Sequence, residues 1–146
     1  MKSGTSAGLG RRVAAGIYDA LLLVGVLMVY TAALLFLTHG QAVLGDTVGA
    51  TWALLYRVSL IGVVGAYFVV NWTLSGQTLG MRAWHLHAVD AGGRRLKPGR
   101  AALRYLLGIA AWLPAGLGVL WLLVDPERLA VHDRLSGTRV VHVPGS

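Results

Sequence analysis

Residues 13–38 read VAAGIYDALLLVGVLMVYTAALLFLT, and Asp19 carries the one charge in this apolar run. A hydrocarbon core about 30 Å thick is crossed by roughly 20 apolar residues in a helix, so the run predicts a first transmembrane helix. A cleaved secretory signal is not expected. The run is too long for a signal core, Asp19 lies near its start, and no small-residue cleavage pattern precedes the polar loop that follows.

The composition of the whole chain also indicates a membrane protein. The 146 residues are 55% hydrophobic and only 13% charged, which is too apolar for an ordinary soluble domain. A second apolar run, residues 50–75, is interrupted by Arg57 and Asn71 and predicts a second transmembrane helix. Arg57 is expected to extend toward the headgroups, and Asn71 to bond a neighbouring helix. The absence of cysteine excludes disulfides, thiolate catalysis and thiolate-bound metals.

A third apolar run, residues 101–124, is broken in its middle by Pro114. Proline removes a backbone donor and disfavours helical geometry in the residue before it, and Gly116 and Gly118 ease a turn. Two interpretations stay open, namely a short helical hairpin that folds back at Pro114 or one kinked third span. The predicted fold class is therefore an all-α polytopic membrane protein, with two full transmembrane helices plus this broken hairpin or third span.

Lys and Arg side chains predict the orientation, because positively charged segments resist translocation and stay in the cytoplasm. They gather before the first helix and in the loop 76–100, whereas the loop 39–49 has neither residue type. The N-terminus and the loop 76–100 are therefore predicted to face the cytoplasm at a bacterial inner membrane. The formal net charge of +7 is assigned to contacts with membrane lipids and not with nucleic acid, since no nucleic-acid-binding pattern surrounds these residues.

A small cytoplasmic β-hairpin or sheet is predicted from two β-rich runs. Residues 82–89 alternate apolar and polar side chains and predict a strand with His85 and His87 on one solvated face. Residues 138–143 predict a second strand. The two strands can pair only if the tail, residues 125–146, is also cytoplasmic, so the sheet and the hairpin interpretation support each other.

The two ends of the chain carry weaker signals. The tail is expected to begin with a helix that has Asp125 as its N-cap and stops at Ser136 and Gly137. Residues 1–10 are expected to be flexible. No internal repeat is visible, so a single domain covering residues 1–146 is predicted.

Asp19 is the side chain that most strongly suggests chemistry. An ionised aspartate costs roughly 2.5 to 3.5 kcal/mol at the centre of a membrane helix, so it needs a partner, water or a proton. Arg12 lies two helical turns earlier on the same face and can extend toward it. Two interpretations stay open, namely ion or proton handling by Asp19 or structural pairing with an arginine of the cytoplasmic face.

Other reactive patterns are weak. Gly62 and Ala66 form a small-xxx-small pair that indicates a helix contact and a homo-oligomer. No nucleophile elbow, phosphate loop or zinc-protease motif appears, so neither an enzyme nor a bound cofactor is expected. A metal site is not expected either, because no Cys and no nearby Glu accompany the four histidines of the predicted cytoplasmic face, which are His85, His87, His132 and His142.

Three blocks of sequence stand out, RRVAAGIYD at residues 11–19, GQTLGMR at residues 76–82 and DPERLAVHDRLSGT at residues 125–138. In this order they resemble the RDD family of bacterial membrane proteins, and the resemblance covers nearly the whole chain. The arginine and the two aspartates of the family name correspond by motif position to Arg12, Asp19 and Asp133. The other motif positions are Gly76, Gln77, Thr78, Gly80, Arg82, His132, Arg134, Gly137 and Thr138, and Met81 stands where the family usually has a lysine.

The resemblance implies a transport-related function, for a cation, a proton or a small solute, and some members of the family look like sodium/proton antiporters. A polar cluster is expected at the inner surface, made of Arg12, Asp19, Arg82 and Asp133. Such a cluster is either an ion or proton site or a clasp that locks the tail against the first helix. The alternative function is a non-catalytic accessory or assembly subunit of a larger membrane complex, and lipid-linked substrate handling at the basic inner surface is a third.

Overall fold

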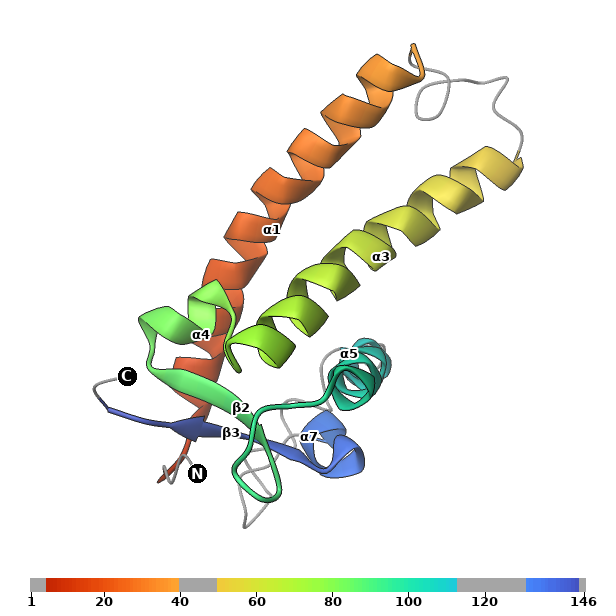
Figure 1. Ribbon diagram of the computed structural model, residues 1–146. Coiled ribbons are helices and arrows are strands. Elements are labelled where there is room, and N and C mark those ends of the chain that lie inside the picture. The colour runs from red at the N-terminus through yellow and green to blue at the C-terminus, as the bar shows by residue number, and fades with distance from the viewer. Residues whose placement is uncertain (1–4, 40–49, 113–130, 145–146) are drawn as a thin grey trace. The chain divides into compact units, whose positions relative to one another are not determined.

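The computed structural model describes residues 5–39, 50–112 and 131–144 (Figure 1). The chain divides into two compact units. One consists of Met1–Asp19 and Phe68–Ser146 and is called the sheet unit, and the other consists of Ala20–Tyr67 and is called the helical unit. The elements in chain order are β1 (Thr5–Ser6), α1 (Leu9–Leu37), α3 (Ala50–Leu74), α4 (Leu79–Ala83), β2 (Leu86–Asp90), α5 (Pro98–Trp112), α7 (Val131–Ser136) and β3 (Thr138–His142).

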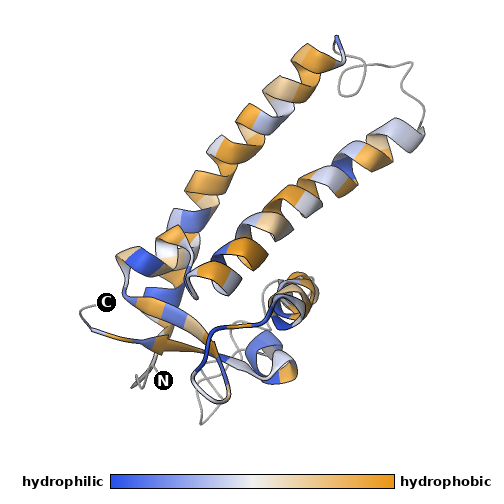
Figure 2. Cartoon of the chain, in the orientation of Figure 1, coloured by the Kyte–Doolittle hydropathy of each residue, from blue (hydrophilic) through white to orange (hydrophobic). Residues whose placement is uncertain are grey.

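Two helices are long and apolar enough to cross a membrane, Leu9–Leu37 and Thr51–Leu74. Apolar residues dominate both of them along their length (Figure 2). The prediction of two transmembrane helices is thus confirmed. Helix α1 begins at Leu9 and not at residue 13, because arginine is a good helix former and the hydrophobic run marked only the apolar part of the helix.

Several polar side chains of the helical unit bond to neighbours within the unit. Thr31 Oγ1 lies 2.9 Å from the Tyr56 hydroxyl oxygen, and the Ser59 hydroxyl donates to the carbonyl of Tyr56 over 2.7 Å. Bonds of this kind are required of polar groups in lipid, where water supplies no alternative partner. Gly62 and Ala66 lie on exposed positions of α3, and a Cβ added at Gly62 would meet no atom within 4 Å.

The sheet unit contains a three-stranded antiparallel sheet in the order β1-β3-β2. Strand β3 pairs with β2 from Leu86↔His142 to Asp90↔Thr138, which confirms the predicted pairing of the two β-rich runs. Strand β1 pairs with the other edge of β3, through Thr5↔His142 and Ser6↔Val141. Within residues 1–10, which were expected to be flexible, Thr5–Ser6 thus form a strand and Leu9 begins α1.

The predicted strand over residues 82–89 is correct only in its second half. Thr78 caps the N-terminus of α4 by accepting a hydrogen bond from the Met81 N–H, and this cap overrides the alternating pattern that follows. His85 has a positive φ of 53° and lies outside β2, where it is exposed. His87 is buried within β2, so the two histidines do not share a solvated face as predicted.

Helices α5 and α7 complete the sheet unit. Pro98 begins α5, at a helix position where the missing backbone N–H of proline does no harm. Helix α7 ends at Ser136, and Gly137 follows with φ 62°, as predicted for the stop of this helix. The predicted break at Pro114, the rest of the run to residue 124 and the predicted helix start at Asp125 lie outside the described residues.

Candidate functional site

Asp133 and Asp19 of the sheet unit occupy two separate polar sites. One site surrounds Asp133 on α7, and the other surrounds Asp19 on α1. The single cluster expected from the sequence is therefore divided. Arg12 belongs to the Asp133 site, while Asp19 bonds to the segment that connects α3 with α4.

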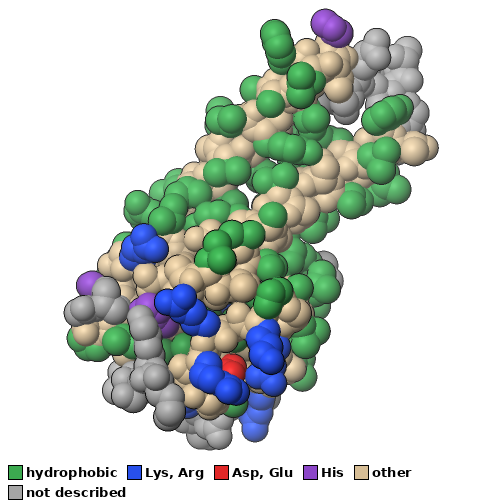
Figure 3. Space-filling model, viewed as in Figure 1, with side chains coloured by type: hydrophobic (Ala, Val, Ile, Leu, Met, Phe, Trp, Pro, Cys, Tyr) green, Lys and Arg blue, Asp and Glu red, His purple; other side chains and the backbone are tan. Residues whose placement is uncertain are grey.

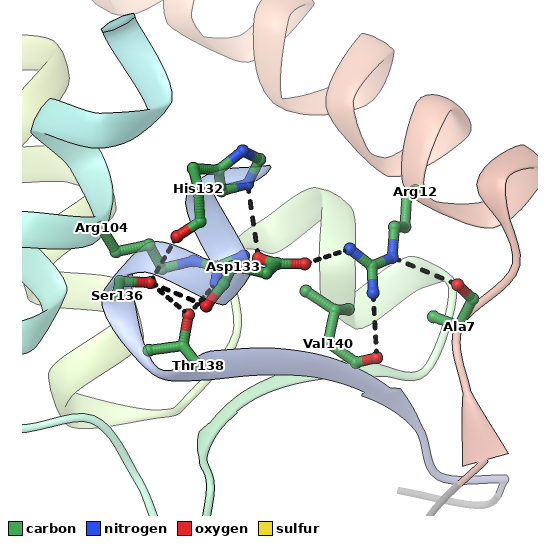
Figure 4. Close-up of polar contacts among 8 residues, drawn as sticks. All are labelled: Ala7, Arg12, Arg104, His132, Asp133, Ser136, Thr138 and Val140. Atoms are coloured by element: carbon green, nitrogen blue, oxygen red, sulfur yellow. Dashed lines mark hydrogen bonds and ion pairs between the residues drawn. The ribbon is translucent and has the colours of Figure 1, made fainter. Parts of the chain in front are cut away.

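Two arginines converge on the fully buried carboxylate of Asp133 (Figure 4). Arg12 Nη1 lies 2.5 Å from Oδ2, and Arg104 Nη1 lies 2.5 Å from Oδ1. The two arginine side chains are only 10% and 4% exposed. Water therefore screens neither pair, and the carboxylate joins α7 to both α1 and α5.

Arg12 also binds two backbone carbonyls with the rest of its guanidinium. Its Nε donates to the carbonyl of Ala7 over 3.2 Å, and its Nη2 donates to the carbonyl of Val140 over 3.3 Å. The planar fork of arginine suits this three-way contact, which a lysine ammonium on its flexible stem does not reproduce. Arg12 thus ties the first turn of α1 to the β1–β3 edge of the sheet.

Arg104 is the residue of this site that the sequence analysis missed. It donates from Nη1 to the Thr138 hydroxyl, and its guanidinium carbon lies 5.0 Å from the centre of the Trp72 ring. Thr138 Oγ1 is in turn 2.7 Å from the Ser136 hydroxyl oxygen. A signal was present in the sequence, because Arg104 is the one charged residue within the otherwise apolar residues 101–112.

The Asp133 site carries more positive than negative charge. Burial alone would raise the pKa of the Asp133 carboxyl, but the positive charges of Arg104 and Arg12 lower it to about 2. His132 Nε2 lies 3.4 Å from Asp133 Oδ1, yet burial lowers the pKa of the imidazole to about 4, so His132 is neutral at pH 7. These four side chains therefore hold two positive charges and one negative charge.

Asp19 is also buried, and its contacts include two neutral donors. The Thr78 hydroxyl donates to Oδ2, and the Gly80 N–H donates to Oδ1 over 2.8 Å. Since Thr78 is the N-cap of α4, both carboxylate oxygens lie at the N-terminal turn of that helix. A Cβ at Gly80 would collide with the Ala15 carbonyl and come within 2.8 Å of Asp19 Cγ, so only glycine permits this approach.

The other residues of the GQTLGMR block support the same loop. Gly76 has φ 74°, and its N–H donates to the Asn71 carbonyl over 3.1 Å, which ends α3. The amide oxygen of Gln77 accepts from Arg82 Nε over 3.2 Å, and its nitrogen donates to His87 Nε2 over 2.9 Å. Arg82 is otherwise exposed, and Met81 is buried in the apolar core.

The remaining motif positions lie on α7 or next to it. Arg134 lies on the exposed side of α7, Gly137 follows that helix, and Thr138 is the first residue of β3. Within residues 5–39, 50–112 and 131–144, no three His, Asp or Glu side chains gather as they would around a metal ion. The polar chemistry of this unit is therefore concentrated at Asp133 and at Asp19.

Comparison with known proteins gives one match. A family model described as the RDD family matches residues 6–137. No curated protein and no solved structure matches the chain. The matched residues include the start of α1, the GQTLGMR block and all of α7, which are the elements that carry the two polar sites.

Proposed function

The chain belongs to the RDD family of membrane proteins, and from this premise we propose a transport-related function in which Asp19 carries the exchanged cation or proton. The observation that carries the proposal is the burial of the Asp19 carboxylate on a helix that is long and apolar enough to cross a membrane. Both of its oxygens are bound at the N-terminal turn of α4, by the Thr78 hydroxyl and by the Gly80 N–H. A carboxylate at such a position in a spanning helix is a candidate for carrying an ion or a proton.

The contacts of Asp19 also suggest how its occupancy is communicated. The ionised carboxylate makes charge-assisted hydrogen bonds to the N-terminal turn of α4. Protonation of Asp19, or capture of a cation, weakens these bonds, because the proton or the cation occupies oxygen lone pairs that accept the hydrogen bonds. The segment from Gly76 to Arg82 is then released from α1, and this segment leads directly into β2.

Reconstitution in liposomes tests the proposal. Proton movement is followed with a trapped pH-sensitive dye after a Na⁺ or K⁺ gradient is imposed, for the wild type and for Asp19→Asn, which keeps the size of the side chain and removes its charge. Asp90→Asn is the matched control, since Asp90 is a carboxylate of β2 whose ion pairs are with Arg94 and Arg100. Flux that Asp19→Asn abolishes and Asp90→Asn preserves supports the proposal, and flux that survives in Asp19→Asn removes Asp19 from it.

The second candidate function is an accessory or assembly subunit of a larger membrane complex. It is favoured by the exposed small-residue positions Gly62 and Ala66 on α3, which permit close approach of another helix. The side chains around them are apolar and exposed, which suits contact with lipid or with a second membrane protein. Absence of flux in the wild type, together with a partner that co-purifies and is lost in Gly62→Ile, supports this function. Gly25→Ile on α1 is the control, since it also adds bulk where no atom lies within 4 Å.

We further propose that the sheet unit faces the cytoplasm at a bacterial inner membrane and that the protein is not an enzyme. Pairing of β1, β3 and β2 requires residues 5–6, 86–90 and 138–142 to lie on one side of the membrane. This pairing supports β2 and β3 lying on the same side of the membrane, and it disfavours a single third crossing between them. A reporter fused after Ser146 tests the orientation, since a periplasmic signal contradicts it.

A further inference from the structure

Helix α5 has one buried face and one exposed apolar face. One face is buried against the sheet unit through Ala101, Arg104 and Ala111. The other carries Leu103, Leu106 and Ile109, whose side chains are 45%, 60% and 38% exposed. At about 100° per residue these two sets of residues lie on opposite sides of the helix. A helix that faced water on its outer side would carry polar residues there.

The inner face holds α5 in place over the sheet unit. Arg104 bonds to Asp133 of α7 and to Thr138 of β3. One residue further on, the Tyr105 ring stacks on Phe68 of α3 with 6.1 Å between the ring centres. The helix thus belongs to the same unit as the three-stranded sheet. Its outer face is available for contact with another molecule or with lipid.

A strongly basic segment leads into α5. Residues 90–100 contain four cationic side chains and one carboxylate, a net charge of 4 − 1 = +3. The four cations, Arg94, Arg95, Lys97 and Arg100, are all exposed. Figure 3 shows Lys and Arg side chains gathered beside an acidic side chain at the lower end of the molecule. Asp90 compensates only part of this charge, through contacts of 3.4 Å to Arg94 and 3.9 Å to Arg100.

We propose that α5 is an interfacial helix that lies in the plane of the membrane surface. Leu103, Leu106 and Ile109 enter the outer acyl region, and the basic segment 94–100 binds the phosphate groups of anionic lipids. An exposed apolar stripe next to a cluster of Lys and Arg is the arrangement that favours anionic membrane surfaces. Arg100 begins the stripe, because it precedes Leu103 by three residues, so the charged and apolar parts adjoin on one side of the helix.

The geometry favours an in-plane helix over one that enters the bilayer end-on. The inner face of α5 bonds to α7, which leads directly into β3 of the sheet. A helix held alongside a sheet by a buried ion pair cannot leave the membrane surface without breaking that pair.

Spin labels measure the position of the outer face directly. The chain has no cysteine, so Leu103→Cys, Leu106→Cys and Ile109→Cys each give one nitroxide site in the full-length protein. Reconstituted in vesicles, the three labels are expected to report the same shallow depth from their accessibility to O₂ and to a nickel chelate. Met28→Cys in α1 and Arg139→Cys in β3 serve as the lipid and water references, since both side chains are exposed.

Each other outcome contradicts the proposal. A depth that increases by about 9 Å from residue 103 to residue 109 indicates a helix that enters the bilayer along its normal. High accessibility to the nickel chelate at all three sites indicates a face in water. Protection from both reagents indicates contact with protein, such as a second copy of the chain.

The headgroup preference has its own test in purified full-length protein. Binding of short-chain phosphatidylglycerol is measured by native mass spectrometry with phosphatidylcholine as competitor. Lys97→Gln/Arg100→Gln is expected to weaken it about 30-fold, since each cation near an anionic surface contributes roughly fivefold in affinity. Arg82→Gln/Arg139→Gln is the control with the same loss of charge on exposed positions of other elements, and it is expected to bind normally.

Two results overturn the lipid assignment. Equal binding of phosphatidylglycerol and phosphatidylcholine removes the role of the anionic headgroup. Inorganic phosphate that displaces phosphatidylglycerol at equal concentration indicates a site for a free anion and not for a membrane lipid.

Discussion

Arg12 and Asp133 are 121 residues apart in the sequence, and their side chains meet at 2.5 Å in the buried part of the sheet unit. This ion pair joins the first turn of α1 to α7, and therefore joins the two ends of the described chain. Arg104 completes it from α5. The Asp133 site thus acts as a clasp of the sheet unit, while the Asp19 site is the candidate for exchange.

Removal of the Asp133 charge is expected to destabilise the sheet unit strongly. Asp133→Asn leaves Arg12 and Arg104 buried without the carboxylate that compensates them, at a cost of about 3 to 5 kcal/mol. Thermal unfolding in detergent, followed by circular dichroism, measures the loss. Asp90→Asn removes a carboxylate from a more solvated pair and is expected to shift the midpoint little.

A charge-conserving change at Arg12 tests the three-way contact of its guanidinium. Arg12→Lys retains the charge beside Asp133 but loses bonds to the carbonyls of Ala7 and Val140, so a loss of about 1 to 3 kcal/mol is expected. Arg11→Lys is the matched control, because Arg11 is exposed on the neighbouring position of the same helix. Equal unfolding midpoints for the two variants would show that only the charge of Arg12 matters.

The close approach of α4 to α1 depends on Gly80. In Gly80→Ala the new methyl group meets the Ala15 carbonyl, a backbone atom that cannot move aside, and the expected loss is about 1 to 3 kcal/mol. Gly108→Ala on α5 has free space and is expected to be neutral or stabilising. Hydrogen exchange at Gly80 and Met81 provides a local readout, and unchanged protection there contradicts the prediction.

The stability of the sheet unit is expected to fall as the pH decreases from about 6.5 to about 4. The pKa of His132 is lowered from 6.5 to about 4 in the folded state. Between these two values the unfolded chain binds a proton that the folded chain does not bind, and this stabilises the unfolded state. The full loss is about 3 kcal/mol. Asp133 stays ionised here because its pKa is lowered to about 2, and its own contribution is lost only as the pH falls further.

Unfolding midpoints measured between pH 8 and pH 4 give this slope. His132→Gln cannot titrate and is expected to flatten it, whereas His39→Gln, on an exposed position after α1, is expected to leave it unchanged. A wild-type midpoint that stays constant down to pH 4 contradicts the assignment of a buried, neutral His132.

Features that depend on local pattern could be predicted from the sequence. The two long apolar runs gave the two spanning helices, because length and hydropathy are sufficient for that assignment. The run 138–143 and the second half of the run 82–89 gave β3 and β2, and Gly137 marked the end of α7. Arg12, Asp19 and Asp133 were singled out by the resemblance, and both aspartates are buried.

Features that depend on distant partners could not be predicted in this way. The pattern of residues 82–89 favours a strand throughout, but Thr78 and Asp19, which lie outside that window, stabilise a helical turn at its start. Strand β1 is only two residues long, and its pairing with β3 is what holds it in the sheet. The choice of Arg104 as second partner of Asp133 depends on the packing of α5 on α7, which no local period encodes.

The central position of β3 has a consequence for biosynthesis. Both edges of this strand are occupied, by β1 and by β2, yet the ribosome makes it after α1, α3 and α5. Nascent chains therefore insert their hydrophobic helices while two strand edges still await pairing, a state that invites proteolysis or aggregation. The sheet therefore completes late, only after the helices that precede β3 in the chain have been synthesised.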